Sequence, residues 1–212
     1  MNTDKILWDI DTQNDIILPT SNFAVPGAYK MVEQFGEAIK YFENQGVPVM
    51  GVLDAHTGKE SVLGTRDENL PLHCIKGTSG QRKIKETDGD ILYVSDHPYE
   101  DCALDLVVDE IKSGKRIYFE KQCQSCESNP NIAYVVKKLG VKEVYLMGAL
   151  INVCVRFSDS MFKKLGVQTY LVLDALKGVD FPGDTVADAI SQMTKEGTKL
   201  FEYKKAQDGP IG

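Results

Sequence analysis

The sequence predicts an α/β fold, a three-layer α/β/α arrangement around a mostly parallel, doubly wound sheet of about six strands. Two observations lead to this class. Short apolar runs alternate with segments of helical period along the chain, and no linker rich in Ser, Gly or Pro interrupts the alternation. Strands separated by helices pair in parallel through right-handed crossovers, so helices cover both faces of the sheet. We expect one domain over residues 1–212, with a flexible tail over 205–212.

The elements of the first half follow from the spacing of the apolar residues. Strands are predicted at 6–10, at 47–53 and, after a long irregular stretch, at 91–94. The helices between them carry apolar residues three or four positions apart, which places those side chains on one helical face. The two stripes are Val32, Phe35, Ile39 and Phe42, and then Leu104, Val107, Val108 and Ile111.

The second half repeats the pattern. Strands are predicted at 116–119, 144–147 and 167–173, and a last helix is expected near 184–197. The helical stripes between the strands are Ile132, Val135, Val136 and Leu139, and then Val155, Met161, Phe162 and Leu165.

Composition and charge narrow the class of partner. The 212 residues are 42% hydrophobic and 26% charged, as in ordinary soluble proteins, and no apolar run approaches the roughly 20 residues of a membrane helix. A formal net charge of −7 argues against a nucleic acid or an anionic lipid surface as partner. Five cysteines at irregular spacing do not predict a disulfide framework, and nothing resembles a signal peptide. We therefore expect a cytoplasmic protein that binds a small molecule.

Polar residues with chemical potential stand where the predicted strands end. Parallel α/β sheets bind ligands outside the carboxyl ends of their strands, so these residues are expected to meet in one crevice. Alone, each acid would be interpreted as a cap of the following helix. Together they bring acids, a base and a thiol to one place. They are Asp9, Asp11, Asp54, Lys121, Cys154 and Asp174.

Cys154 is the candidate nucleophile. It follows the strand at 144–147 and an elbow at Gly148, and it stands at the start of the next predicted helix. The exposed N–H groups and the dipole of a helix N-terminus favour a thiolate, as a nucleophilic cysteine requires. The alternative is a small buried cysteine that only packs under the strand.

Four sequence blocks become specific when their order and spacing are taken together. They are DTQND at 11–15, DAH at 54–56 with HCIKGTSG at 73–80, Lys121 at a strand end, and GALINVCV at 148–155. On these blocks the chain resembles the isochorismatase-like cysteine hydrolases, and within them most closely the nicotinamidases. The resemblance covers roughly residues 5–180. It implies a small carboxamide substrate and a homo-oligomer, either a dimer or a tetramer.

The resemblance also implies a catalytic triad of Asp11, Lys121 and Cys154. Asp9 competes with Asp11 for the role of the acid, because alternation along a strand puts both on one face, with Asp9 one step deeper. The DxQND register favours Asp11.

An acid, a base and a thiol in one crevice predict attack on an amide. Asp11 would take the thiol proton of Cys154 while the ammonium of Lys121 stabilises the thiolate, so we expect a nucleophile that is ready at neutral pH. By resemblance, the backbone amides of Leu150 and Cys154 bind the oxyanion and are aimed by a cis peptide between Ala149 and Leu150. Asp11 then protonates the departing nitrogen, ammonia leaves, and a water activated by the same carboxylate hydrolyses the thioester.

Asp54, His56 and His73 form a predicted metal site. One carboxylate and two imidazoles suit Zn²⁺ or a similar divalent ion with open positions. In nicotinamidases the matching residues bind such a metal, which holds the ring nitrogen of the substrate. The alternative is a polar surface loop with two solvated histidines, and the flanking HCIKGT block favours the metal. His97 has no matching role and is expected to be a loop residue.

The predicted substrate pocket departs from the nicotinamidase pattern. The positions that carry ring-stacking aromatic residues in nicotinamidases are non-aromatic here, namely Ile16, Ala55, Leu70 and Glu127. Ile16 and Leu70 could still grip a ring, and Phe181 or Tyr99 is a candidate to replace the lost wall. An acid at position 127 would weaken a nearby thiolate unless it points away or binds a cationic group of the substrate.

Cys123 and Cys126 form a CxxC motif directly after Lys121. A redox pair and half of a zinc site are the alternatives to local packing. Packing is favoured because the other candidate ligands, Cys74 and Cys102, stand singly.

These patterns together predict a cysteine-dependent amidohydrolase, with nicotinamide hydrolysed to nicotinate as the best single reaction. An amidohydrolase of a ureido, carbamoyl or biuret-like substrate is the alternative, and an aliphatic pocket would suit it. Isochorismate cleavage is disfavoured because it needs no thiol at Cys154. A non-catalytic binding protein on the same fold is disfavoured by the complete set of Asp11, Lys121 and Cys154.

Overall fold

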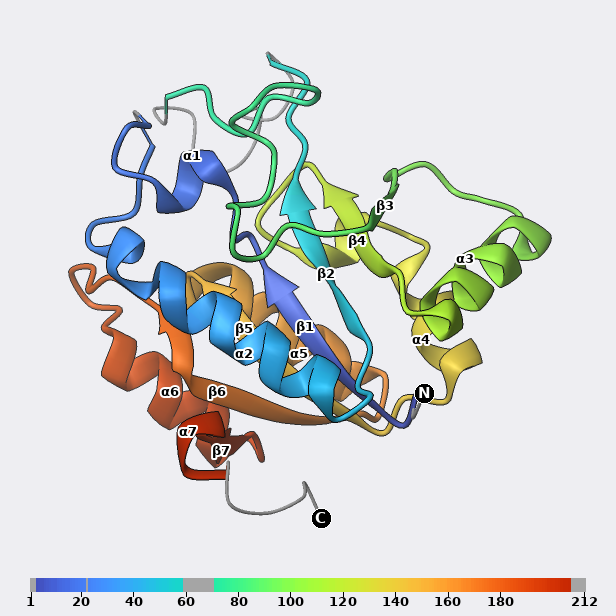
Figure 1. Ribbon diagram of the computed structural model, residues 1–212. Helices are drawn as coiled ribbons and strands as arrows, with labels where there is room; N and C mark the ends of the chain where they lie inside the picture. The colour runs from blue at the N-terminus through green and yellow to red at the C-terminus, as the bar shows by residue number, and fades with distance from the viewer. Residues whose placement is uncertain (1–2, 22, 59–70, 207–212) are drawn as a thin grey trace.

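The strands of one sheet are spread along the described chain, from Lys5 to Phe201. The computed structural model describes residues 3–21, 23–58 and 71–206. Within these ranges, seven parallel strands form one sheet in the order β3-β4-β2-β1-β5-β6-β7 (Figure 1). The strands are β1 Lys5–Ile10, β2 Val49–Asp54, β3 Ile91–Val94, β4 Arg116–Lys121, β5 Glu143–Ala149, β6 Gln168–Lys177 and β7 Lys199–Phe201. The predicted α/β class with a parallel sheet is confirmed.

Helices cover both faces of the sheet, as the alternating sequence pattern predicts. One face packs against α2 (Val32–Asn44) and the short α1 (Asn14–Ile17) and α7 (Tyr203–Ala206). In Figure 1, α2 crosses in front of the strands. The other face packs against α3 (Asp101–Ser113), α4 (Ile132–Leu139), α5 (Arg156–Lys164) and α6 (Val186–Lys195). No helix in the described part of the chain is both long and apolar enough to cross a membrane.

The core is densest around Trp8, which is fully buried in β1. Its ring meets Phe162 of α5 edge-on at 5.0 Å between centroids and stacks on Phe119 of β4 at 6.0 Å. Full burial of one such aromatic side chain contributes about 2 kcal/mol. The apolar stripe predicted on α5 therefore faces the central strands.

The C-terminal part differs from the prediction in two ways. The sequence did not predict β7, a three-residue strand that pairs with β6 and leaves Leu200 exposed. Residues 205 and 206, which the prediction assigned to the tail, belong to α7. Tyr203 is fully buried there and donates its hydroxyl to Oε2 of Glu37, 2.8 Å away. Residues 207–212 lie outside the described residues.

The carboxyl ends of β1 and of the nearby strands β2, β4 and β5 lie at one end of the sheet. Strand β2 lies on one side of β1 and β5 on the other, so the end of β1 is the point where the strand order reverses. The register places Ile10 beside Gly148, and Asp54 beside Lys121. Gly148 has φ 113°, and a Cβ at this position would lie 2.0 Å from the Ile10 carbonyl oxygen. Only glycine allows β5 to leave the sheet so close to β1.

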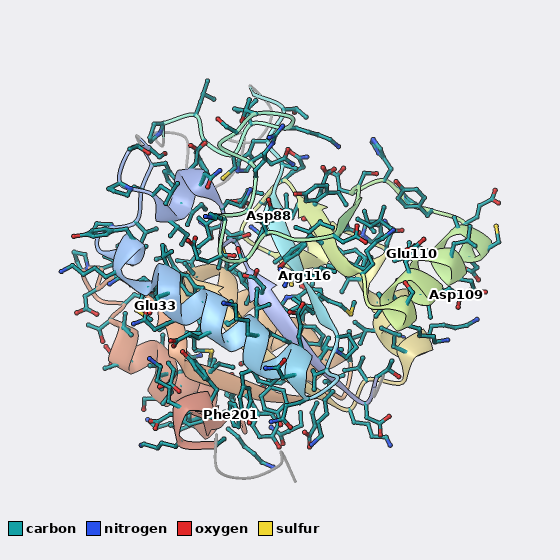
Figure 2. All side chains as sticks on the ribbon, viewed as in Figure 1. Glu33, Asp88, Asp109, Glu110, Arg116 and Phe201 are labelled. Carbon is teal, nitrogen blue, oxygen red and sulfur yellow. The ribbon has the colours of Figure 1, made fainter. Side chains whose placement is uncertain are left out.

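The long segment between β2 and β3 is fastened back to the sheet. Arg116, at the start of β4, donates from Nη1 to the carbonyl oxygens of Thr87 and Asp88, at 3.1 and 2.6 Å (Figure 2). Its Nε donates to Glu43 of α2 at 2.8 Å. One guanidinium therefore ties the end of this segment to β4 and to α2.

Candidate active site

A cavity of about 400 Å³ opens at the carboxyl ends of β1, β2, β4 and β5. The sequence predicts that polar residues at strand ends meet in one crevice, and four of the six line this cavity: Asp11, Asp54, Lys121 and Cys154. Asp174 does not line it, and its carboxylate accepts a hydrogen bond from the backbone N–H of Lys204 instead.

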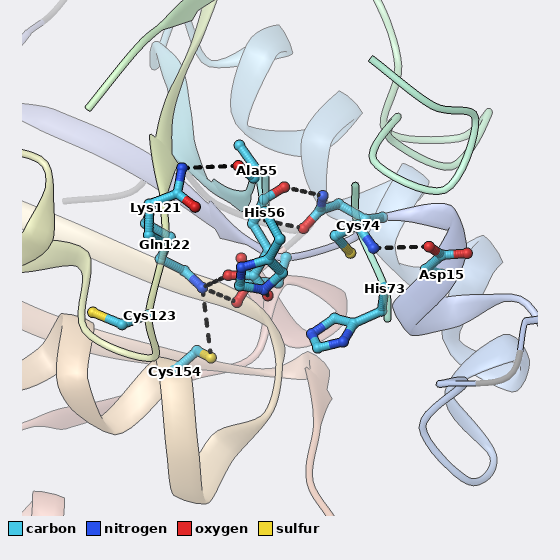
Figure 3. A network of polar contacts seen from close by, with 12 residues as sticks. Asp15, Ala55, His56, His73, Cys74, Lys121, Gln122, Cys123 and Cys154 are labelled. Atoms are coloured by element: carbon cyan, nitrogen blue, oxygen red, sulfur yellow. Dashed lines mark hydrogen bonds and ion pairs between the residues drawn. The ribbon is translucent and has the colours of Figure 1, made fainter. Parts of the chain in front are cut away.

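Lys121 connects the other three groups. Its Nζ lies 3.0 Å from Oδ2 of Asp11 and 3.9 Å from Sγ of Cys154, and it donates to Oδ1 of Asp54 (Figure 3). The Lys121 side chain is 1% exposed. Two carboxylates and one thiol therefore share a single buried ammonium.

This sharing sets the protonation states of the carboxylates. Burial raises the pKa of Asp11 to about 7, against the pull of the Lys121 ammonium. Burial acts in the same direction on Asp54, but the Lys121 ammonium and, less strongly, His56 and His73 lower the pKa of that carboxyl overall. Burial disfavours the ammonium, yet the two carboxylates hold the pKa of Lys121 well above its usual value. Asp54 and Lys121 are therefore charged at neutral pH, while Asp11 is poised to exchange a proton.

The thiol of Cys154 is neutral in the resting site. Burial raises its pKa well above the usual value, and the charges of Asp11 and Asp54 add to this effect against the pull of Lys121. The described groups around Cys154 therefore favour the neutral thiol, in contrast to the thiolate expected from the sequence. The sequence argument considered the helix N-terminus and the lysine but not the cost of a third anion beside one ammonium.

The backbone aims Asp11 into the site. Strand β1 ends at Ile10, and Asp11 has φ 52°, a left-handed conformation that Asp adopts more readily than most residues. The Asp11 carbonyl accepts from the N–H of Gln13 at 2.8 Å, which closes a three-residue turn. Oδ1 of Asp11 is buried, and no N–H or O–H group of the described residues donates to it, while the thiol of Cys154 forms a hydrogen bond with the Asp11 carboxyl. A buried acceptor without an N–H or O–H donor is rare in folded proteins and is available to take a proton.

Asp9, the competitor for the acid's role, is engaged elsewhere. Its Oδ2 lies 2.8 Å from Nζ of Lys83 and accepts from the hydroxyl of Tyr118 at 2.7 Å. The hydroxyl of Thr12 donates to the same carboxylate. Asp9 and Lys83 are both fully buried, so they neutralise each other beneath the cavity rather than within it.

The elbow after β5 presents Cys154. The peptide between Ala149 and Leu150 is cis, and residues Ile151–Val155 form a π-helical turn that leads directly into α5. The Leu150 carbonyl accepts from the N–H groups of Val153 and Val155 at 3.1 and 3.0 Å. Cys154 therefore lies inside this wide turn, two residues before Arg156, the first residue of α5.

The predicted metal ligands come together beside this group. Asp54, His56 and His73 each offer a ligand atom, and these atoms lie within 4.8 Å of one another. Oδ2 of Asp54 is 3.8 Å from Nε2 of His56, while Oδ1 of the same carboxylate faces Lys121. One carboxylate oxygen and two imidazole nitrogens at this spacing fit a divalent ion such as Zn²⁺.

The DTQND block joins the two halves of the site. Gln13 donates from Nε2 to the Asp54 carbonyl and accepts from the Asp54 N–H, both at 2.8 Å. Oδ2 of Asp15 accepts from the N–H of Cys74 at 2.8 Å, which holds the residue next to His73. A Cβ on Gly80 would lie 2.0 Å from Oδ2 of Asp15, so this close packing requires glycine. The block therefore links the end of β1 to both segments that carry metal-ligand candidates.

Comparison with known proteins identifies the family of this chain. The model of the Isochorismatase domain family matches residues 6–203. The chain belongs to the isochorismatase family. A comparison with curated protein sequences gave no match.

Solved structures of similar fold include several amidases. A pyrazinamidase of Pyrococcus horikoshii in complex with zinc is 23% identical over 94% of this chain and 99% of its own, with a TM-score of 0.69. A nicotinamidase/pyrazinamidase from Bacillus subtilis is 19% identical over 94% and 100%, with a TM-score of 0.71. An N-carbamoylsarcosine amidase from Thermoplasma acidophilum is 20% identical over 99% of both chains, with a TM-score of 0.69. These similarities establish the shared fold of this isochorismatase-family chain.

Two aromatic residues line the cavity of this family member, although the positions that are aromatic in nicotinamidases are non-aromatic here. Phe23 and Phe181 both line it, and Ile16 lines it as predicted. Leu70 lies outside the described residues. Tyr99 is not among the lining residues and shares a hydrogen bond with Ser95 instead, 3.0 Å away. Of the two candidates for a replacement wall, Phe181 is therefore the one at the cavity, and Phe23 was missed.

Glu127 is not a pocket residue, so this part of the predicted site was wrong. It stands in a 3₁₀ turn, and its carboxylate accepts from Nζ of Lys164 on α5 at 2.8 Å, with both side chains well exposed. Glu127 pairs with Lys164 at the surface and is not among the residues that line the cavity. Glu127 therefore points away from the cavity, and its charge does not oppose a thiolate at Cys154.

The CxxC motif separates into two environments. Cys123 lines the cavity, whereas Cys126 is buried with its Sγ 3.4 Å from Sδ of Met161. Burial raises the pKa of Cys126 to about 11, as for an inert packing cysteine. All five cysteines are free thiols.

Proposed function

We propose that this protein is a cysteine-dependent amidohydrolase that cleaves a small carboxamide to an acid and ammonia. One observation carries the proposal: the ammonium of Lys121 contacts both Asp11 and Cys154, and the thiol of Cys154 forms a hydrogen bond with the Asp11 carboxyl. A proton acceptor, a fixed positive charge and a thiol thus line one cavity.

The three side chains divide the acylation step. The thiol proton of Cys154 passes to Asp11, whose pKa of about 7 suits it both to accept and to release a proton near neutral pH. Sulfur then forms a bond to the amide carbon, and Lys121 stabilises the negative charge on sulfur as the proton leaves. The neutral resting thiol means that ionisation accompanies attack rather than preceding it. The C–N bond breaks, the proton on Asp11 goes to nitrogen, and ammonia departs.

Deacylation uses the same acid. A water molecule gives a proton to Asp11 and attacks the thioester carbon, the C–S bond breaks, and the proton returns to Cys154. In both steps the negative charge develops on the carbonyl oxygen, and the backbone amides of Leu150 and Cys154 are the proposed donors to it. Leu150 and Cys154 both line the cavity, which supports this assignment.

Asp54, His56 and His73 are the proposed metal ligands. A divalent ion held there, Zn²⁺ in our proposal, would bind a lone pair of the substrate and so orient its amide relative to Cys154. The spacing of the three ligand atoms supports this role.

Nicotinamide is the proposed substrate, and a carbamoyl or ureido compound is the second candidate. The ring of Phe181 at the cavity supports a flat substrate, because an aromatic face stacks on a planar ring. The structural similarity to an N-carbamoylsarcosine amidase supports keeping the second candidate.

Ammonia release from a panel of amides tests the proposal. The panel contains nicotinamide, benzamide, acetamide, N-carbamoylsarcosine and biuret, and it is measured for the zinc-loaded wild type and for Cys154→Ala. We expect release from at least one compound and none above background with Cys154→Ala. Release that persists in Cys154→Ala, or no release from any compound, contradicts the proposal. The preferred compound decides between the two substrate classes.

A further inference from the structure

Phe23 and His73 form a stacked pair. Their ring centroids are 3.6 Å apart and their planes differ by 15°, so the two rings lie face to face. Both residues line the cavity. They come from separate segments, one between α1 and α2 and the other between β2 and β3. The His73 ring is thus covered on one face by a residue distant in sequence.

The edge of the His73 ring also has contacts, with Pro71 and with His56. Nδ1 lies 2.8 Å from the carbonyl oxygen of Pro71. A carbonyl oxygen only accepts hydrogen bonds, so Nδ1 of the neutral ring carries the proton and Nε2 carries the lone pair. The ring meets that of His56 edge-on, with centroids 4.8 Å apart and planes at 75°. The lone pair that remains on His73 is therefore the one available for a metal ion.

We infer that Phe23 is a positioning residue for His73 and tunes the affinity of the Asp54, His56 and His73 site for its metal. The hydrogen bond to Pro71 restrains one edge of the imidazole, and the stacked ring of Phe23 restrains its plane. Partners that orient a metal-binding histidine typically change metal affinity by about 10- to 100-fold when they are lost. This inference rests on the metal site of the proposed function.

Phe23 is suited to this role because its own backbone is held. Its N–H donates to Oγ of Ser21 at 3.1 Å, and the N–H of Val25 donates to the Ile16 carbonyl at 2.8 Å. The side chain is only half-buried, so removing the ring takes little apolar surface out of the core. An effect of substitution on metal binding therefore separates from an effect on folding.

Metal affinity, rather than turnover, is the test. Chelator-stripped wild type and Phe23→Leu are titrated with Zn²⁺ in competition with a chromophoric chelator. Loading with Co²⁺ then gives an absorption spectrum that reports on the geometry of the ligands. Phe23→Leu should bind Zn²⁺ about 10-fold more weakly and alter the Co²⁺ spectrum. Phe23→Tyr, which keeps the ring, should restore both. Phe181→Leu is the matched control, because Phe181 lines the same cavity and no ring contact joins it to His73 within the described residues.

The double variant separates positioning from general packing. In a His73→Ala background the ligand is gone, so Phe23→Leu should cause no further loss of Zn²⁺ affinity. Wild-type affinity in Phe23→Leu, an equal loss in both backgrounds, or an absence of Zn²⁺ binding by the wild type overturns the inference. Should Phe23→Leu fail to fold, Phe23→Met is used in its place with the same expectations. A protein that binds Zn²⁺ as expected but releases no ammonia refutes the proposed function and leaves this inference standing.

Discussion

Lys121 donates through its ammonium to Oδ1 of Asp54, so one hydrogen bond joins the proposed catalytic group to the proposed metal group. The other oxygen of Asp54 faces His56. A single carboxylate therefore compensates the lysine on one side and offers a ligand on the other. Substitutions on either side of this bond should affect both stability and binding.

Lys121→Met should destabilise the protein strongly and in a pH-dependent way. It leaves Asp11 and Asp54 buried without their counter-ion, and removing one partner of a buried pair typically costs about 3–5 kcal/mol. The loss should be smaller at pH 5 than at pH 8, because Asp11 is protonated below its pKa of about 7. Urea unfolding at both pH values measures it. Lys164→Met, which breaks only the exposed pair with Glu127, should cost no more than about 1 kcal/mol.

Asp11→Asn should make Cys154 easier to alkylate while it impairs catalysis. The negative charge of Asp11 is one cause of the raised pKa of the thiol, so a neutral side chain should increase the fraction of thiolate. Loss of the proton acceptor should nevertheless reduce kcat for amide hydrolysis by about 100-fold or more. Iodoacetamide labelling of Cys154 at pH 7 and ammonia release measure the two effects. Slower alkylation in the variant would contradict the charge argument.

The pH dependence of stability should also report on Asp11. Its pKa in the folded protein is about 7, above the usual 3.8, so between these values the folded state binds more protons than the unfolded state. Stability therefore falls as pH rises through this window, by at most about 1.4 kcal/mol per pH unit. Between pH 5 and pH 8, Asp11→Asn should lose less stability than the wild type in chemical denaturation. Parallel stability profiles would show that Asp11 ionises normally.

The wall that carries Phe181 should depend on an ion pair next to the nucleophile. Arg156 donates to both carboxylate oxygens of Asp184 at 3.1 and 2.7 Å, and Asp184 exchanges two backbone hydrogen bonds with Phe181. Asn152 adds hydrogen bonds from Nδ2 to the carbonyl oxygens of Val179 and Asp184. Asp184→Asn should therefore raise KM by up to about fivefold, equivalent to about 1 kcal/mol, with little change in kcat.

The control for this prediction is a more exposed ion pair, between helices α3 and α4. Asp105→Asn breaks the contact between Asp105 of α3 and Lys138 of α4, 2.9 Å long, and should leave KM unchanged. A change of kcat without a change of KM in Asp184→Asn would mean that the ion pair acts on Cys154 itself rather than on the wall.

The sequence predicted those parts of the site that follow from strand order. Asp11, Asp54 and Lys121 each stand at the end of an apolar run, and parallel strands bring such ends together whatever the details of packing. Cys154 was found because it follows the elbow after β5, which has a sequence signal of its own. The three metal-ligand candidates likewise lie close to a strand end or to a motif.

The features that the sequence missed depend on contacts between segments without a period. Phe23 stands in an irregular segment, and nothing in its neighbours indicates that it stacks on His73. Glu127 was assigned to the pocket because it matches an aromatic pocket position of nicotinamidases, but it stands in the 3₁₀ turn at Cys126–Ser128 and pairs with Lys164. Strand β7 has three residues, too few for alternation to show.

The hydrogen bond between Asp15 and the N–H of Cys74 gives the site a built-in dependence on folding order. Asp54 and His56 leave the sheet directly, so they are in place as soon as β2 has paired. His73 reaches them only after its own segment has docked against the turn that follows β1. Metal affinity thus reports whether the segment that carries His73 has docked. A chain with an intact sheet and this segment undocked would keep its far-UV circular dichroism but lack His73 as a metal ligand.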